Sequence, residues 1–177
     1  MIIETVKQKL QDILPAAIES APQEGSSEIP EGQKQEKIKQ EAARTDGIIE
    51  REYADRGYHL DVQLATDQLL AAVGVLYDCG FFIETITGVD WIKDGQLEAV
   101  YDFNRYDFDL CRVVLRTRTP RSQPVLPTIT GIYTGANWHE RETHDFFGIV
   151  FQGHPHLIPL LLPEDADFHP LLKDFKA

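Results

Sequence analysis

The chain of 177 residues is long enough for one ordinary domain with a tail or linker beside it. A hydrophobic content of 42%, with nine Phe, six Tyr and two Trp, suffices for a buried core and excludes global disorder. A formal net charge of −12 repels phosphate backbones, which argues against nucleic acid as a partner.

The first 57 residues are expected to lie outside the main domain. Apolar residues recur at helical spacing over residues 2–19, and this pattern predicts an amphipathic N-terminal helix within residues 1–20. Residues 21–57 are expected to form a flexible linker, because the stretch after Pro22 is rich in Glu, Gln, Ser, Gly and Pro. A short polar helix is placed within this linker, around Lys37 to Glu50.

Residues 58–152 are predicted to form an α+β domain. Thr66 is expected to cap a helix that ends at Gly80. The expected apolar face of this helix consists of Leu69, Leu70, Val73, Leu76 and Tyr77. The helix is followed by "FFIETITGVD", which is typical of a strand, and by a turn at Asp94-Gly95.

Alternating inward-facing residues predict two further strands in this domain. The first strand carries Leu97, Ala99, Tyr101 and Phe103, and the second carries Cys111, Val113, Leu115 and Thr117. Together these elements predict a two-layer fold in which a helix packs on a small antiparallel or mixed sheet. Cys79 and Cys111 lie in no CxxC motif or disulfide framework and are expected to be buried, reduced thiols in an intracellular protein.

Residues 153–177 are predicted to form an extended C-terminal arm. Four prolines, at positions 155, 159, 163 and 170, interrupt nine large apolar residues and prevent a continuous helix. Burial of five of these apolar side chains would contribute about 7 to 15 kcal/mol before entropy. We therefore expect the arm to lie on a partner protein. The alternative is that it folds back on its own domain.

The stretch "NWHERETHDFFG", residues 137–148, concentrates histidines, charges and aromatics. His139 and His144 are five residues apart, about 140° around a helix, which excludes the HExxH zinc motif. Neither Glu140 nor Glu142 has a histidine three residues later, as a di-iron bundle requires. No nucleophile elbow or phosphate-binding glycine loop is present. We therefore predict no catalytic, cofactor-binding or metal-binding residue. A looser histidine cluster remains open as an alternative, formed by His154, His156 and His169.

Helical geometry instead predicts a charged ridge. Arg141 and Asp145 are four residues apart, and Glu140 and His144 share a second row. We expect these pairs, with aromatic anchors at Trp138, Phe146 and Phe147, to form a seam that is buried on assembly. The alternative is a solvated helix face whose aromatic residues lie in the local core.

The motif and the arm resemble the signature of the 30-kilodalton subunit family of respiratory complex I (NADH-quinone oxidoreductase) and related membrane-bound hydrogenases. The pattern A-x-W-x-E-R-E-x-x-D-x-x-G-I-x-F-x-G-H-P matches Ala136, Trp138, Glu140, Arg141, Glu142, Asp145, Gly148, Ile149, Phe151, Gly153, His154 and Pro155. The later H-P-L-x-K-D matches His169, Pro170, Leu171, Lys173 and Asp174. The resemblance covers about Tyr58 to Phe175 and agrees with the predicted α+β domain.

The resemblance implies a non-redox structural subunit in the peripheral arm of a membrane-bound, ion-translocating NADH:quinone oxidoreductase-like complex. Such a protein clamps the hydrogenase-like large subunit near the quinone site and binds no cofactor itself, while the complex carries iron–sulfur clusters and quinone. Its other partners are an iron–sulfur small subunit and membrane subunits, so it reaches the membrane, on the cytoplasmic face, only through partners. The implied partner-binding residues are Trp138, Glu140, Arg141, Glu142, Asp145, Phe147, Gly148, His154, Pro155, His169, Pro170, Lys173 and Asp174.

Two departures from the family pattern keep other interpretations open. Ile158-Pro159 stands where the family commonly has a basic pair, and Leu172 stands where an arginine is usual. These differences suit the equivalent subunit of an energy-converting [NiFe] hydrogenase, with a nickel–iron centre, or of a complex fed by formate or ferredoxin. A hypothesis from another class is a free-standing interaction or metal-handling module that uses the histidine-rich end.

Overall fold

The structure is a computed structural model that describes residues 2–14, 47–105, 107 and 110–176. Its centre is a five-stranded mixed sheet. In spatial order the strands are β1 (Gly47–Glu50), β2 (Leu60–Leu64), β5 (Val113–Pro120), β4 (Gln96–Asn104) and β3 (Phe82–Trp91). A two-stranded parallel sheet consists of β6 (Val125–Pro127) and β7 (Val150–Gln152).

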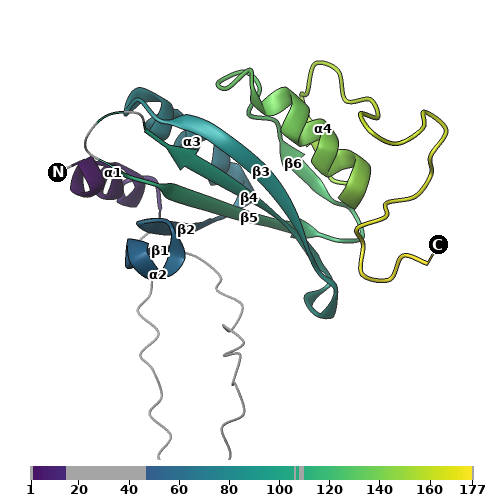
Figure 1. Cartoon of the computed structure of the whole chain (residues 1–177), viewed down its shortest axis with the longest axis horizontal. Coiled ribbons are helices and arrows are strands. Elements are labelled where there is room, and N and C mark those ends of the chain that lie inside the picture. The colour runs from purple at the N-terminus through teal and green to yellow at the C-terminus, as the bar shows by residue number, and fades with distance from the viewer. Residues whose placement is uncertain (1, 15–46, 106, 108–109, 177) are drawn as a thin grey trace, which may run out of the picture.

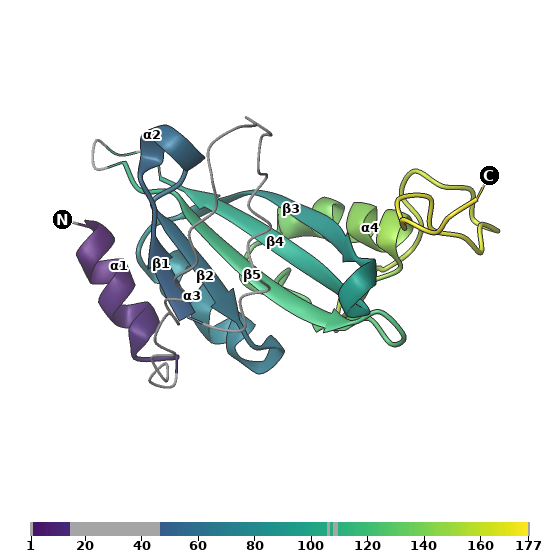
Figure 2. The same cartoon turned by 90° about the horizontal axis from the view of Figure 1, so that it is seen from below.

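Four α-helices and two short 3₁₀ segments surround the sheets in the described part of the chain (Figures 1 and 2). The helices are α1 (Ile2–Gln11), α2 (Tyr53–Arg56), α3 (Leu69–Asp78) and α4 (Ala136–Phe147), and the 3₁₀ segments are η1 (Thr66–Gln68) and η2 (Ile92–Asp94). Strands β3, β4 and β5 form an antiparallel meander, while β2 pairs in parallel with β5. The predicted α+β class with a mixed sheet is confirmed.

The alternation predicted along β4 is confirmed, because Leu97, Ala99, Tyr101 and Phe103 are all buried in the core. Glu98, which points to the opposite face of β4, is also buried. Its carboxylate accepts hydrogen bonds from Arg118 Nε at 3.0 Å and from Trp91 Nε1 at 3.1 Å. These paired groups compensate for the desolvation of a buried charge. Among the described residues neither cysteine forms a disulfide; Cys111 is buried as predicted, whereas Cys79 is only half-buried.

Helix α3 buries a narrower stripe than the sequence analysis predicts. Leu69, Val73 and Leu76 are buried, but Leu70 and Tyr77 are 44% and 57% exposed, so the prediction was wrong for these two residues. At about 100° per residue they lie some 80° to 100° from Leu69. Gly80 ends the helix region with φ +78°, as predicted.

Thr66 does not cap α3, contrary to the prediction. It begins η1, and its hydroxyl donates to the carbonyl of Arg118 at 3.3 Å. This contact ties the start of the helical region to the neighbouring strand β5.

The domain begins earlier in the chain than predicted. Residues 47–50, which were predicted to end a short polar helix within the linker, instead form β1 and pair antiparallel with β2. The strand was missed because GIIE offers only two apolar residues between polar flanks. Helix α1 ends at Gln11 and packs against α3, with Val6 and Leu10 buried. Residues 15–46, which hold most of the predicted linker, lie outside the described residues.

Candidate partner-binding site

Helix α4, which carries the NWHERETHDFFG motif, has two distinct faces. At about 100° per residue, Ala136, Glu140, Thr143 and Phe147 fall on one face, whereas Trp138, Arg141, Glu142 and Asp145 fall on the other. The first face packs on the edge strand β3, beside which α4 lies in Figure 1. The C-terminal arm contacts the second face through residues 158–162. The motif residues therefore divide between two different structural roles.

The β3-facing side of α4 depends on close packing at Gly88. A Cβ at Gly88 would lie 2.3 Å from Cδ2 of Phe147, so only glycine lets the Phe147 ring approach the strand. The hydroxyl of Thr143 donates to the carbonyl of His139 at 2.8 Å and lies 3.5 Å from that of Ile86 on β3. Gly148 then ends the helix with φ +76°. Phe147, a predicted partner-binding residue, is thus half-buried against its own sheet.

Glu140 is completely buried. It lies four residues before His144 on α4, but the two side chains do not pair as the sequence analysis predicted. Its carboxylate accepts hydrogen bonds from Thr128 Oγ1 at 2.5 Å and from the Ile129 amide at 2.7 Å. Burial raises the pKa of Glu140 to about 7, and the two hydrogen bonds oppose that shift only in part. The prediction failed because the loop before α4 offers Glu140 donors, while the His144 ring bonds instead to the carbonyl of Ile149.

Arg141 and Asp145 bond to the arm and not to one another, so the predicted ion pair is wrong. Arg141 donates from Nε to the carbonyl of Ile158 at 3.0 Å and from Nη2 to that of Pro159 at 2.8 Å. Oδ2 of Asp145 accepts the amides of three successive residues, Leu160 at 2.8 Å, Leu161 at 2.7 Å and Leu162 at 3.2 Å. The arm has no helix or strand here, so its backbone groups require such partners.

The local electrostatics favour an ionised Asp145 as the acceptor of these three amides. Burial works against its charge, but the three amide donors outweigh burial and hold the pKa of Asp145 below its usual value. The side chain therefore acts as an ionised acceptor at the turn of the arm. Charge-assisted hydrogen bonds of this kind are stronger than neutral ones.

A second set of contacts holds the end of the arm. The His169 ring bonds through Nδ1 to the carbonyl of Asp145 at 2.8 Å and lies against Gly148, where a Cβ would be 2.7 Å from the ring. The amide of Lys173 donates to Oδ2 of Asp90 at 2.8 Å, and Arg121 pairs with both Asp90 and Asp174. Arg121 holds the pKa of the Asp174 carboxyl below its usual value. The arm is thus attached at two places along its length.

The side chains of the arm divide between the domain and solvent. Leu157 and Leu172 pack against the core. Five large apolar side chains are exposed, by between 38% and 61%: Ile158, Leu161, Phe168, Leu171 and Phe175. The backbone of the arm therefore folds back on its own domain, as in the alternative of the sequence analysis. The exposed apolar side chains remain available to a partner.

The remaining predicted residues have mixed environments. Trp138 is 62% exposed, and the guanidinium of Arg141 lies 5.4 Å from its ring centroid. Glu142, Pro155 and Lys173 are exposed, and Pro170 is half-buried. The side chain of His154 is fully buried, 4.0 Å from Glu140, and burial lowers the pKa of His154.

Asp90, Arg121 and Thr128 take part in this arrangement but were not predicted from the sequence. Asp90 and Arg121 lie at the ends of β3 and β5, 31 residues apart, and no motif spacing connects them. β3 and β5 each pair antiparallel with β4, and only this shared pairing brings their C-terminal ends to the same side of the sheet. The one signal available in the sequence was an acidic residue, Asp90, at the end of a predicted apolar strand.

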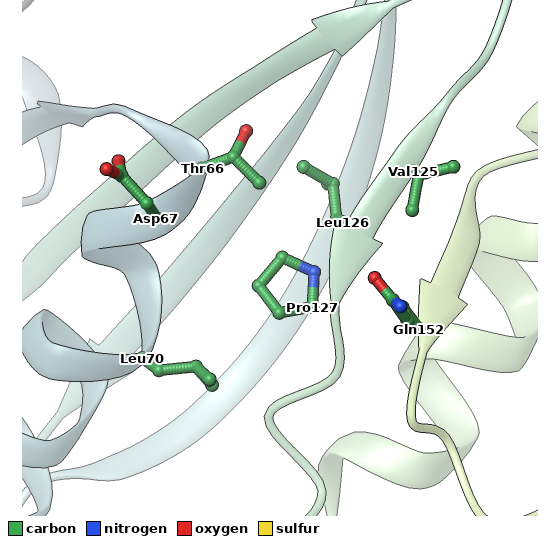
Figure 3. A pocket seen from close by; sticks show the side chains of 7 residues that line it. All are labelled: Thr66, Asp67, Leu70, Val125, Leu126, Pro127 and Gln152. Atoms are coloured by element: carbon green, nitrogen blue, oxygen red, sulfur yellow. The ribbon is translucent and has the colours of Figure 1, made fainter.

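Two further features bear on chemistry. In the part of the chain that the structure describes, no group of three or more His, Cys, Asp or Glu side chains is arranged to hold a metal ion. A shallow groove of about 340 Å³ lies between η1, the start of α3 and strands β6 and β7 (Figure 3). Its lining is mostly apolar and includes Leu70, Leu126 and Pro127. Asp67 is the one ionisable residue among those that line it.

Within the same described ranges, every helix is too short or too polar to cross a membrane.

The fold and motif define a family of respiratory-complex subunits. The profile of the family described as "Respiratory-chain NADH dehydrogenase, 30 Kd subunit" matches residues 62–177, and the chain belongs to this family. The resemblance seen in the sequence is confirmed.

Individual relatives come from more than one branch of respiratory enzymes. The chain is 43% identical over 94 residues to the C subunit of NADH-quinone oxidoreductase from Roseiflexus sp. (strain RS-1), covering 52% of this chain and 53% of that protein. It is 41% identical over 94 residues to the C subunit of F(420)H(2) dehydrogenase from Methanosarcina mazei, covering 52% and 59%. The chain thus spans about half the length of these curated relatives.

A chain in the structure of the membrane-bound sulfane sulfur reductase, an archaeal respiratory membrane complex, is similar in fold, with a TM-score of 0.63 and 27% identity. This match covers 76% of the present chain and 79% of the other.

Proposed function

We propose that this chain is a non-redox structural subunit in the peripheral arm of a membrane-bound, ion-translocating NADH:quinone oxidoreductase-like complex. In this role α4 and the C-terminal arm clamp the hydrogenase-like large subunit near its quinone site. The iron–sulfur small subunit and the membrane subunits are the further partners, and the chain meets the cytoplasmic face of the membrane through them. The chain holds no cofactor, while the complex carries iron–sulfur clusters and quinone.

One observation carries this proposal: the backbone of the arm is bonded to α4, yet its large apolar side chains point outward. Arg141 and Asp145 supply five hydrogen bonds to residues 158–162. The five side chains are 38% to 61% exposed, so burial of the area that remains exposed would contribute about 3 to 7 kcal/mol before the costs of association. An arm held in this way loses less conformational entropy on binding than a free one, which favours a tight, permanent contact.

The proposed mechanism is indirect. Clamping the large subunit fixes the distance and orientation between the last iron–sulfur cluster of the complex and the electron acceptor. The residues of α4 act by positioning the arm. Neither Glu140 nor Asp145 needs to exchange a proton during turnover for this function.

A second candidate is the equivalent subunit of an energy-converting [NiFe] hydrogenase or of a formate- or ferredoxin-linked complex. The departures at Ile158-Pro159 and Leu172 favour it, because they remove basic residues from the arm. Ile158 is exposed and Leu172 packs on the core, so Ile158 is the departure that would alter a partner contact.

The test is a pull-down from native membranes in gentle detergent, with an affinity tag at Met1 and mass spectrometry of the recovered proteins. Recovery of a hydrogenase-like large subunit, an iron–sulfur subunit and antiporter-like membrane subunits is the expected result. A nickel-binding or an NADH-binding subunit among them distinguishes the two branches. Recovery of this chain alone from the soluble fraction would contradict both.

A further inference from the structure

A loop of the C-terminal arm, residues 163–168, is held at both ends by Asp145. Oδ2 of Asp145 accepts the amide of Leu162 at 3.2 Å before the loop, and the carbonyl of Asp145 accepts from the His169 ring at 2.8 Å after it. Within the loop, the Ala166 amide donates to the carbonyl of Pro163 at 3.0 Å and closes a turn. The loop therefore projects from a fixed base.

Four large apolar side chains on and beside this loop are exposed, and we call them the arm surface: Leu161, Phe168, Leu171 and Phe175. The rings of Phe168 and Phe175 stack with centroids 5.6 Å apart. A stacked aromatic pair flanked by exposed leucines is typical of the centre of a protein interface. The arm surface thus has the composition of a docking site.

Acidic residues surround the arm surface. Glu164 and Asp165 occupy the two central positions of the turn, and Asp167 precedes Phe168; all three side chains are exposed. Residues 153–177 contain four acidic side chains against two lysines, and the fourth acid, Asp174, is paired with Arg121. The chain as a whole has a formal charge of −12. A free surface of this kind gains most from a partner of opposite charge.

We infer that the arm surface docks on a protein face that is apolar at its centre and rimmed by Lys or Arg, and that Glu164, Asp165 and Asp167 steer the encounter. This inference rests on the proposed function and specifies the chemistry of the partner's face. A membrane is the disfavoured occupant, because anionic headgroups repel the acidic rim. Steering by opposite charges raises the association rate and makes it depend on salt.

The test measures association and dissociation rates between the full chain and the large subunit recovered with it, at about 0.05 M and about 0.5 M salt. The variant Glu164→Gln/Asp165→Asn/Asp167→Asn removes the acidic rim. Its matched control, Glu4→Gln/Asp12→Asn/Asp55→Asn, removes the same charge beside α1 and α2, at the opposite end of the molecule from the arm (Figure 2).

For the wild type we expect the association rate to fall roughly tenfold or more between the two salt concentrations. The acidic-rim variant associates about tenfold more slowly at low salt and loses most of the salt dependence, while its dissociation rate changes less than about threefold. The control variant stays close to wild type. Phe168→Ala/Leu171→Ala has the complementary effect and mainly speeds dissociation.

A complex whose association rate is indifferent to salt and to the acidic-rim variant would overturn this inference and leave the proposed function intact. Failure of the wild-type chain to bind the large subunit at all would overturn the proposed function, and this inference with it. Binding of the wild-type chain to vesicles of phosphatidylcholine and phosphatidylserine would overturn the choice of a protein partner.

Discussion

Oδ2 of Asp145 lies 2.7 Å from the main-chain nitrogen of Leu161, one of three successive amides that this single oxygen accepts. Asp145 is buried beneath the C-terminal arm, although it belongs to the charged stretch NWHERETHDFFG. It converts a segment without regular secondary structure into one with a fixed path. The path of residues 160–162 therefore depends on one carboxylate of α4.

Asp145→Asn is expected to loosen the arm. The amide side chain cannot supply an ionised acceptor to three donors, and hydrogen bonds to charged groups are each worth about 1.5 to 3 kcal/mol. We expect the local opening free energy at residues 160–162 to fall by about 2 to 4 kcal/mol. Hydrogen exchange of the amides of Leu160, Leu161 and Leu162 measures this directly.

Glu142→Gln is the matched control for Asp145→Asn, because Glu142 lies on the same face of α4 but is exposed. We expect it to change the exchange of these amides by less than about 0.5 kcal/mol. Equal protection in the Asp145→Asn variant and in the wild type would contradict the role assigned to Asp145.

Glu140 predicts an unusual pH dependence of stability. Its pKa is raised to about 7 in the folded protein, from an ordinary value of 4.5, mainly by burial. Between these two pH values the folded state binds more protons than the unfolded state, so stability falls as pH rises and levels off above the folded pKa. We expect a loss of about 2 to 3 kcal/mol between pH 5 and pH 8.

The variant Glu140→Gln should remove this slope, as measured by urea unfolding at each pH. Burial lowers the pKa of both His59 and His154, and these residues contribute an opposite slope near pH 6. Both proteins contain them, so the difference between the two profiles isolates Glu140. Parallel profiles for variant and wild type would show that Glu140 is not buried as described.

Gly88→Ala is expected to destabilise the packing of α4 on β3. The added methyl would lie within 2.3 to 2.9 Å of three carbons of the Phe147 ring, which must then move. Overpacking of this kind costs about 1 to 3 kcal/mol in the free energy of unfolding. Chemical denaturation measures the loss.

Gly74→Ala is the control for that substitution, since nothing lies within 4 Å of its added Cβ and Gly74 is inside α3. This variant should gain about 0.5 to 1 kcal/mol from helix propensity. A Gly88→Ala protein as stable as wild type would mean that α4 does not contact β3 as closely as the structure indicates.

Arg141→Ala is expected to lower assembly and enzymatic activity of the complex together. Without the guanidinium, the carbonyls of Ile158 and Pro159 lose their donors, and the arm is no longer presented in its binding conformation. Native gel electrophoresis and turnover in membranes measure the two quantities, with the exposed Lys93→Ala in the β3–β4 turn as control. Normal assembly with lost turnover would point to direct catalysis.

Metal removal separates the subunit interpretation from the free-standing metal-handling module. We expect EDTA to leave the melting temperature of the purified chain unchanged, and added zinc or nickel to have no stabilising effect. A metal that bound the folded chain specifically would raise the melting temperature by mass action. Such a rise would favour the histidine-rich cluster of His154, His156 and His169.

The sequence by itself determined the class of the fold and the family. Strict alternation at Leu97, Ala99, Tyr101 and Phe103 predicted β4, because a strand that covers a core must bury every second residue. The prolines of the arm predicted its extended backbone, because proline removes amide donors locally. These signals are local in the chain, so they can be read without knowing which segments pack against them.

Only the tertiary structure decided which groups the charged residues meet. Spacing on a helix paired Arg141 with Asp145, but both bond to backbone groups of an arm that lies 15 or more residues away in the chain. The same held for Glu140, whose partners lie in the loop before α4, and for Asp90 and Arg121 at two strand ends. A helical spacing shows which side chains can reach one another. The choice of partner depends on which backbone donors and acceptors lie buried nearby and have no other hydrogen-bond partner.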